Sequence, residues 1–381
     1  MPFGATLTRL EVYRTRSVRG EPYAGLVSRD RRAIVVGGGI IGLSTAFRLA
    51  REQWKVTLFD PAPARGATWA AAGMLAPSAE VIPGERENFE QQRGALRAWR
   101  NFADELVDAG AFAPMMRDTG TLLVGWDASD RAYVEQFASV ARDFGVDVTE
   151  VARHDHPELY DSLSPRVLDG YLLKGDGWID PDEAVDALLQ ANEHLGVRVI
   201  RELVARVETS PEGVIAHGSS CTVEAEFGIL ATGASSLPQG AYGTHSVRPI
   251  RGITVRLQGL DRSAQPTLRA FVRGRTFYLV SHPSGYCIAG ATSEERPDAH
   301  VEVGELANLL RDALDLVPSL DGAQLVETRY GLRPVSNDLD PFLEVLEGGK
   351  WIWSSGHFRH GVTMAPLASR DTLKLLASLE P

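Results

Sequence analysis

The sequence VGGGIIG at residues 36–42 decides the fold. It follows a short apolar run, residues 33–36, and opens a segment in which Leu43, Phe47 and Ala50 recur at helical spacing. A second apolar run, residues 56–59, ends on Asp60. The order strand, glycine-rich turn, helix, strand and acid predicts a βαβ unit that binds a dinucleotide.

Each part of this fingerprint has a physical reason. Gly37 permits the tight turn, Gly39 lets the backbone approach a pyrophosphate, and Gly42 lets helix and strand pack closely. The helix N-terminus offers free N–H groups and a partial positive charge to phosphates. Asp60 can accept hydrogen bonds from a ribose hydroxyl pair, and its charge disfavours a 2′-phosphate. An ordinary glycine-rich turn is the alternative, but both strands and the acid favour the dinucleotide site.

Four segments carry a resemblance to a known family. Small residues dominate GATWAAAGML at residues 66–75, so its backbone can lie close to a flat ligand, although a tightly packed helix start has the same composition. Three further segments follow in order, GILATGA at 228–234, YGLRP at 330–334 and SGHFRHG at 355–361. Together they resemble the flavin-contacting and substrate-arginine motifs of the glycine oxidases, within the D-amino acid oxidase family of FAD enzymes. The likeness covers about residues 31–380.

The resemblance implies an α/β fold, with a Rossmann-like FAD-binding domain interleaved with an α+β substrate domain that contains an antiparallel sheet. The FAD-binding domain is expected at residues 30–110, 165–245 and 327–381, and the substrate domain at residues 111–164 and 246–326. Short β-rich runs between 246 and 292 also predict the antiparallel sheet from their own pattern. Residues 1–29 precede the family fold and lack an apolar signal core, so we expect a mobile N-terminal extension.

Helix-period segments are predicted at residues 86–108, 130–144, 303–316 and 362–379. Another helix begins after Asp180, a good N-cap, with Pro181 at its first position and Glu183 able to complete a capping box. Gly196 ends it, and residues 197–200 are predicted as a parallel strand.

The resemblance also implies FAD bound without a covalent link and assigns its contacts. Arg251 matches a residue near the isoalloxazine ring, although an exposed turn is the alternative, and His357 has a packed or capping role as its alternative. A helix N-terminus near Gly361 would stabilise the negative charge of reduced flavin. The expected cofactor-binding residues are Gly37, Gly39, Ile40, Ile41, Gly42, Asp60, Thr68, Ala71, Ala72, Gly73, Met74, Thr232, Gly233, Arg251, Arg333, His357, Arg359, Gly361, Val362 and Thr363.

Arg333, Tyr278 and Arg359 are the expected catalytic residues. A guanidinium matches a carboxylate with two charge-assisted hydrogen bonds, and the resemblance gives Arg333 the substrate carboxylate, with a structural ion pair as the alternative. Tyr278 resembles the family's carboxylate-binding tyrosine, although a core tyrosine is equally common and a one-residue slip would turn Phe277 inward instead. Arg359 lies in the loop that passes the flavin in the family.

The chain departs from the family pattern near these residues. Tyr330 stands where the family has a small residue, Ser281–His282 replaces a proline and a basic residue, and His360 replaces an asparagine. The family's Gly-x-Pro-Tyr-Ile-Gly stretch reads LDPFLE at residues 339–344. Because Tyr330 and His282 are expected to flank the carboxylate-binding residues, the pocket is expected to be reshaped, which puts glycine itself in doubt as the substrate.

The activity that the resemblance implies is oxidative deamination of a small amino acid or amine. Hydride passes from the substrate Cα to flavin N5, the imino acid hydrolyses to an oxo acid and ammonia, and dioxygen as acceptor yields hydrogen peroxide. In the glycine oxidases the imine feeds thiazole synthesis for thiamine. A flavin dehydrogenase, a sarcosine or D-amino acid oxidase, and a flavoprotein subunit of a larger complex remain alternatives, whereas the small-residue segment after Asp60 disfavours an NAD-dependent dehydrogenase.

Composition limits the other classes. At 381 residues the chain is long enough for two domains, and a net charge of −11 argues against nucleic acid or an anionic membrane as partner. No apolar run of about 18 residues is present, so no transmembrane helix is predicted. Cys221 and Cys287 stand in no metal-ligand pattern and suit the reducing cytoplasm, so we expect no metal. A homo-oligomer is left open.

Overall fold

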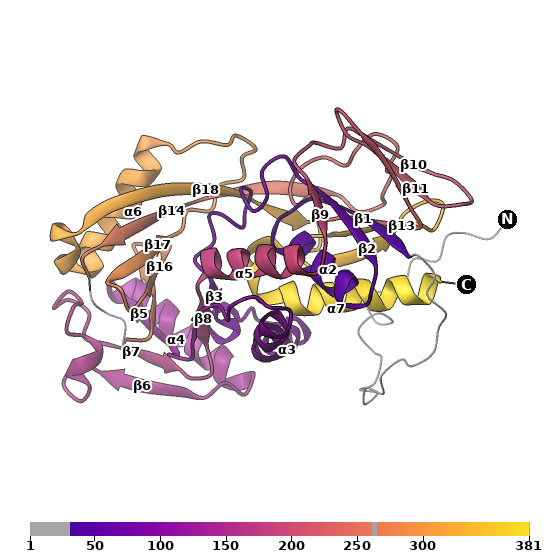
Figure 1. The fold of residues 1–381 in the computed structure, drawn as a ribbon. Coiled ribbons are helices and arrows are strands. Elements are labelled where there is room, and N and C mark those ends of the chain that lie inside the picture. The colour runs from indigo at the N-terminus through magenta and orange to yellow at the C-terminus, as the bar shows by residue number, and fades with distance from the viewer. Residues whose placement is uncertain (1–30, 261–264, 381) are drawn as a thin grey trace.

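The structure, a computed structural model, describes residues 31–260 and 265–380, so the expected extension at 1–29 lies outside the described residues. Two halves are visible, each built on its own large sheet (Figure 1). A six-stranded sheet with most of the helices forms one half, and an eight-stranded sheet forms the other.

The six-stranded sheet carries the fingerprint. Its strands are parallel except for the edge strand β19. In spatial order they are β19 (Phe342–Val345), β20 (Trp351–Ser355), β13 (Phe227–Leu230), β1 (Arg32–Val36), β2 (Lys55–Phe59) and β9 (Arg198–Ile200). Ala33 and Val35 pack into the core under the helices, and Ile34 and Val36 pack into the core on the opposite face. A parallel strand buried on both faces explains why the run is apolar throughout.

Helices cover one face of this sheet and a small β-meander covers the other. The helices are α2 (Ile40–Arg51), α3 (Arg86–Asp108), α5 (Pro181–His194) and α7 (Gly361–Leu379), and the meander is β10 (Arg206–Thr209), β11 (Val214–His217) and β12 (Thr222–Ala225). The predicted helices at 86–108 and 362–379 are confirmed within a residue. So is the parallel strand at 197–200, which pairs with β2 as β9.

The start of α5 differs in one detail from the prediction. Asp180 is the N-cap and accepts the N–H groups of Asp182 and Glu183 at 2.9 and 3.0 Å. The Glu183 carboxylate does not return to the Asp180 N–H, because it accepts the Met115 N–H at 2.7 Å instead. Only one of the two hydrogen bonds of the predicted capping box is therefore present. The Glu183 carboxylate instead connects α5 to the segment that contains Met115.

The eight-stranded sheet contains the predicted antiparallel strands. Its spatial order is β18 (Gln324–Ser336), β14 (Val247–Gln258), β17 (Tyr286–Gly290), β16 (Arg275–Ser281), β15 (Thr267–Val272), β5 (Thr121–Gly125), β7 (Asp169–Leu173) and β6 (Val148–Ala152). Only β15 and β5 run parallel. The predicted helices at 303–316 and 130–144 appear as α6 (Val303–Leu316) and α4 (Ala128–Asp143), and both pack on this half.

Two strands that were expected in the FAD-binding domain belong to the eight-stranded sheet. β7, within the range assigned to the FAD-binding domain, pairs with β5 and β6, so the eight-stranded half extends through Leu173. β18 was also assigned to the FAD-binding domain, yet it pairs with β14 along its length and runs between the two halves (Figure 1). A small sheet of β3 (Met74–Leu75), β8 (Gly177–Ile179) and β4 (Met116–Arg117) joins the two parts.

A helix that spans a membrane must be both long and apolar. No helix in 31–260 or 265–380 combines the length and the apolar character that a membrane span requires.

Candidate active site

A cavity of about 600 Å³ lies between the two large sheets. Residues from all four motif segments line it, together with residues of β16 and β18. The expected cofactor-binding residues line it as well, except Gly42 and Arg251. The fold therefore brings together segments that lie up to about three hundred positions apart in the sequence.

The glycine-rich turn forms one end of this cavity. Gly37 has a φ of +105°, and a Cβ there would overlap the carbonyl oxygen of Ala231. Gly42 faces the Gly37 carbonyl rather than the cavity, so its role is the close packing of α2. α2 begins at Ile40 with no acidic residue in its first turn. The N-terminus of α2 lines the cavity through Gly39, Ile40 and Ile41, and its partial positive charge fits a phosphate, although the Ile40 N–H already donates to Thr68 Oγ1 at 3.0 Å.

Asp60 lies beside this turn with its carboxylate held in place. Its Oδ2 accepts the Gly38 N–H at 2.6 Å, and its Oδ1 accepts the Ala62 N–H at 2.7 Å. Each oxygen has a second lone pair left for a ligand hydroxyl. The acid and the turn therefore fit the ribose and pyrophosphate of a dinucleotide.

Two arginines hold the small-residue segment against the cavity. Arg256 donates to the carbonyl of Ala71 at 3.0 Å, and Arg329 donates to that of Trp69 at 2.9 Å. Arg329 is fixed in turn by a bidentate pair with Asp182, at 2.7 and 2.9 Å. Residues 66–68 and 70–74 line the cavity, as the close approach to a flat ligand requires.

Arg333 is a half-buried cation that faces the cavity from β18. Its Nη1 donates to the Thr292 carbonyl at 3.1 Å, and none of the carboxylates in residues 31–260 and 265–380 forms an ion pair with it. Gly252 on the opposing strand makes room for it, because a Cβ there would overlap the guanidinium. Burial lowers the pKa of Arg333, but a guanidinium stays charged in proteins. The geometry thus lacks the structural ion pair that was the alternative.

Tyr278 faces the same space from β16. Phe277 is 1% exposed and packs in the core of the eight-stranded half, whereas Tyr278 lines the cavity, so the expected register is present. Gly290 opposite leaves room for the ring, because a Cβ there would overlap its hydroxyl. Burial raises the pKa of Tyr278, so its hydroxyl remains a hydrogen-bond donor.

A charged group that sequence reasoning missed lies next to Tyr278. Glu80 accepts from Arg269 Nη1 at 2.7 Å, and its other oxygen pairs with Arg359. Burial would raise the pKa of Glu80, but Arg269 and Arg359 outweigh burial and hold the pKa below its ordinary value. One signal was available: Arg269 is the charged residue in the otherwise uncharged strand TLRAFV.

Asp176 supports Glu80 and was also missed. Its fully buried carboxylate accepts the N–H groups of Ser78 and Ala79, at 2.9 and 3.2 Å, and the Thr121 hydroxyl at 3.0 Å. These bonds hold the 3₁₀ helix Pro77–Glu80. Burial raises the pKa of Asp176 to about 7.

The flavin-loop motif brings a helix N-terminus to the cavity. α7 begins at Gly361 without an acidic residue in its first turn, and Gly361, Val362 and Thr363 all line the cavity. Burial lowers the pKa of His357 and that of His360 to about 4. Both imidazoles are therefore neutral near neutral pH.

This burial predicts a pH-dependent stability. Because the pKa of His357 falls from 6.5 to about 4 on folding, the unfolded chain takes up this proton first, and stability is lost as the pH falls from 6.5 towards 4. At pH 5 the loss is about 2 kcal/mol relative to pH 8. Thermal unfolding of His357→Asn should therefore depend less on pH in this range than the wild type, whereas exposed His154→Asn should match the wild type. An identical dependence of unfolding temperature on pH for the wild type and His357→Asn would contradict this prediction.

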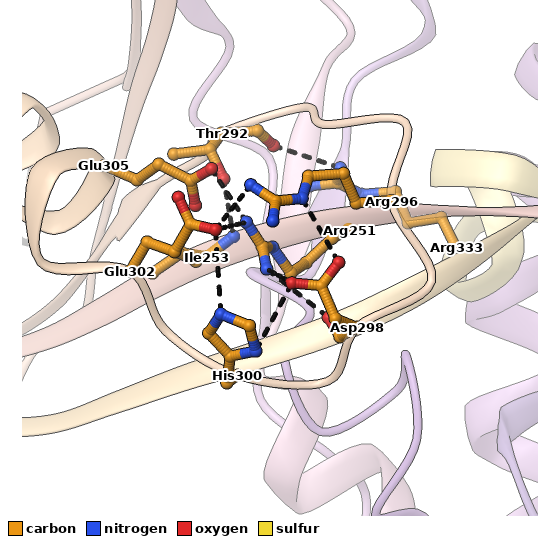
Figure 2. A network of polar contacts seen from close by, with 9 residues as sticks. All are labelled: Arg251, Ile253, Thr292, Arg296, Asp298, His300, Glu302, Glu305 and Arg333. Atoms are coloured by element: carbon orange, nitrogen blue, oxygen red, sulfur yellow. Dashed lines mark hydrogen bonds and ion pairs between the residues drawn. The ribbon is translucent and has the colours of Figure 1, made fainter.

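Arg251 requires a correction, because its side chain points away from the cavity. Adjacent residues of a strand face opposite sides, so Gly252 faces Arg333 and Arg251 faces the other way. Its fully buried guanidinium pairs with Asp298 and Glu305, at 2.6 and 2.8 Å, and Figure 2 shows these partners around it. These pairs hold the segment 291–305, from which the Thr292 carbonyl reaches Arg333.

His282 is a second correction. It does not line the cavity, because its Nδ1 lies 3.3 Å from Asp180 Oδ2 and its ring packs against Trp178. Tyr330 and His360 do line the cavity. Among the departures discussed, these two can therefore reshape the pocket directly.

Comparison with known proteins shows the family of the chain. The family model described as FAD dependent oxidoreductase matches residues 32–375. The glycine oxidase of Bacillus licheniformis is 28% identical over 355 residues, which cover 87% of this chain and 89% of that protein. The bifunctional protein ThiO/ThiG of Synechocystis sp. is 27% identical, over 88% of this chain but 50% of its own length.

Two solved structures share the fold. The crystal structure of glycine oxidase from Geobacillus kaustophilus has a TM-score of 0.82 at 24% identity, over 92% of this chain and 96% of that chain. Iminodiacetate oxidase from Chelativorans sp. BNC1 has a TM-score of 0.79 at 22% identity, with the same coverage. The family match spans nearly all of the described residues, and the predicted resemblance, enzyme class and cofactor are confirmed. The chain belongs to the D-amino acid oxidase family of FAD dependent oxidoreductases.

Proposed function

We propose that the protein oxidatively deaminates a small amino acid or amine. The observation that carries the proposal is Arg333, a half-buried cation without a described carboxylate partner, which faces the cavity together with Tyr278. A partly desolvated charge without a partner is costly, and a substrate carboxylate would supply the missing partner. Overall, the amino acid, dioxygen and water would give an oxo acid, ammonia and hydrogen peroxide.

The residues that line the cavity would have separate roles in binding the substrate and the cofactor. FAD, when bound, supplies the redox chemistry by accepting hydride from the substrate Cα. Arg333 would bind the substrate carboxylate through its fork, and the Tyr278 hydroxyl would donate a further hydrogen bond. The turn at Gly37, Gly39 and Asp60 would hold the dinucleotide, and the N-terminus of α7 would face the isoalloxazine ring.

Several finer features belong to this proposal. The relatives' names support a glycine-oxidase-like reaction, but Tyr330 and His360 line the cavity where the family pattern differs, so the substrate is proposed only as a small amino acid or amine. Dioxygen is the proposed acceptor, and supply of the imine to thiamine synthesis is the proposed use, as the ThiO/ThiG name suggests. A cytoplasmic location is proposed as well, because the thiol of Cys221 is free, which suits a reducing compartment.

A panel of amino acids tests the reaction directly. Each candidate, including glycine, sarcosine and D-alanine, is mixed anaerobically with the FAD-loaded protein, and loss of flavin absorbance is followed. Bleaching by a small amino acid, with peroxide formed on admitting air, would support the proposal. Bleaching without peroxide would favour a dehydrogenase, and no bleaching by any member would contradict an amino-acid or amine oxidase.

Asp60 provides a prediction for the cofactor. Asp60→Ala should weaken FAD binding by roughly 1.5–3 kcal/mol, because a charge-assisted pair with the ribose is lost. Titration of the apoprotein with FAD, followed by flavin fluorescence, measures the change. Asp155→Ala, an exposed carboxylate beside His154, should leave the affinity unchanged. Equal FAD affinity for wild type and Asp60→Ala would show that Asp60 does not bind the ribose.

The mode of attachment is tested in the same preparation. Neither Cys221 nor Cys287 lines the cavity, so no cysteine is placed to link the flavin. Acid treatment should release all of the FAD into the supernatant. Yellow colour that stays with the precipitate would indicate a covalent link.

A further inference from the structure

The substrate end of the cavity carries more positive charge than one carboxylate neutralises. Arg269, Arg333 and Arg359 face it with a single acid, Glu80, so two positive charges remain. Asp60 and Arg65 also line the cavity, but they lie with the glycine-rich turn and balance each other. An amino acid with one carboxylate and a neutral amine would leave one of the two charges uncompensated.

The two uncompensated positive charges lie at different positions in the cavity. Arg333 reaches the cavity from β18 and forms no ion pair with a described carboxylate. Arg269 reaches it from β15 and shares Glu80 with Arg359, so one carboxylate serves two guanidinium groups. Separate cations favour two separate anionic groups on the ligand.

Arg269 is also short of hydrogen-bond acceptors. It is 8% exposed, and its Nη1 donates to Glu80. Its Nε–H is buried and has no partner in the described part of the chain. This Nε–H is closed off from the cavity as well, so an anionic group of a ligand in the cavity would meet the Arg269 guanidinium at its other nitrogens.

The sheet sets the distance between the two anionic groups. Arg269 and Tyr278 are directly opposite each other on β15 and β16, so their Cβ atoms lie about 5 Å apart on one face. Tyr278 is the proposed partner of the first carboxylate. A second anionic group near Arg269 must therefore be only a few bonds away from the first.

We propose that the preferred substrate is a short amino acid with a second carboxylate, which Arg269 and Arg359 bind while Arg333 and Tyr278 bind the carboxylate beside the reacting carbon. This inference rests on the proposed function, whose substrate class it narrows. It makes Arg269 a specificity-determining residue.

Equilibrium binding tests the second site without turnover. The oxidised FAD-loaded protein is titrated with succinate or with succinamate, its half amide, and the change in the flavin absorption spectrum is followed. The two acids have nearly the same shape and differ by one negative charge. We expect succinate to bind about 10- to 100-fold more tightly. Equal affinities would overturn the proposal. The surplus positive charge would then be assigned to stabilising the negative charge of the reduced flavin.

Variants assign the preference to Arg269. Arg269→Gln should abolish the preference for succinate and leave the affinity for succinamate nearly unchanged. Arg275→Gln removes the same charge from a residue that pairs with Asp312 outside the cavity, and should keep the preference. An Arg269→Gln protein that still prefers succinate would overturn the assignment. If Arg269→Gln does not fold, Glu80→Gln decides instead, because it adds to the surplus charge and should increase the preference, whereas an unchanged or smaller preference would contradict the proposal.

Turnover separates this inference from the proposed function. Anaerobic bleaching by D-aspartate should exceed bleaching by D-asparagine at equal concentration, because asparagine has the same shape without the second charge. If no amino acid bleaches the flavin and succinate still binds preferentially, the proposed function fails and the second anionic site stands. If asparagine and aspartate bleach equally, the reaction class stands and the second site fails.

Discussion

Replacing Arg333 with alanine is expected to lower kcat/KM by about 30-fold to several thousand-fold, which corresponds to roughly 2–5 kcal/mol. The reason is that the substrate carboxylate would enter the pocket without its charged partner, and the neighbouring Arg269 and Arg359 are already paired with Glu80. Steady-state kinetics with the best amino acid of the panel measures the loss.

Three comparisons make this result interpretable. Arg333→Lys should recover only part of the activity, because an ammonium group cannot form two parallel hydrogen bonds. Tyr278→Phe should cost less, about 0.5–1.5 kcal/mol for a single hydrogen bond. FAD content should stay normal in all three variants. Near-native kinetics of Arg333→Ala would show that the substrate carboxylate, if there is one, binds elsewhere.

Gly37→Ala is expected to yield a protein that retains little FAD and unfolds at a lower temperature. The substitution places a Cβ against the Ala231 carbonyl at a φ of +105°, so strain in the turn and overlap with the neighbouring strand add to at least about 3 kcal/mol. Thermal unfolding and the ratio of flavin to protein absorbance measure both effects.

The matched control is Gly304→Ala. This glycine lies in α6, has open space where its Cβ would be, and does not line the cavity. Its substitution should leave FAD content normal and stability equal or slightly higher, since alanine favours helix. A Gly37→Ala protein as yellow and as stable as Gly304→Ala would mean that the turn relaxes freely, and the close packing described for it would be wrong.

Local sequence pattern was sufficient for the elements that hold the cofactor end. The turn, α2 and Asp60 form one contiguous unit, in which spacing alone determines geometry. The motif at 330–334 likewise placed Arg333 in the cavity. The position of Tyr278 depended on strand register, which the core position of Phe277 supports.

Long-range pairing explains what the sequence did not reveal. Glu80 meets Arg269 across 189 positions, and Asp176 meets Ser78 across 98, so no local pattern links these partners. Arg251 was misplaced for a different reason. Its neighbour Gly252 faces the cavity, and strand alternation turns Arg251 towards Asp298 and Glu305 instead.

The long pair of β14 and β18 limits how the cavity can open. Pro249 of β14 and Pro334 of β18 are paired beside Arg333. Although proline has no N–H group, these two residues remove no backbone hydrogen bond between the strands. Arg251, two residues further on, exchanges its N–H and C=O with Glu294 rather than with β18, so its pair and the proline pair are both non-hydrogen-bonded positions. The strands are therefore continuous and locally stiffened where a hinge between the halves would have to bend. We therefore expect substrate to enter by movement of side chains and loops rather than by a large bending of these two strands.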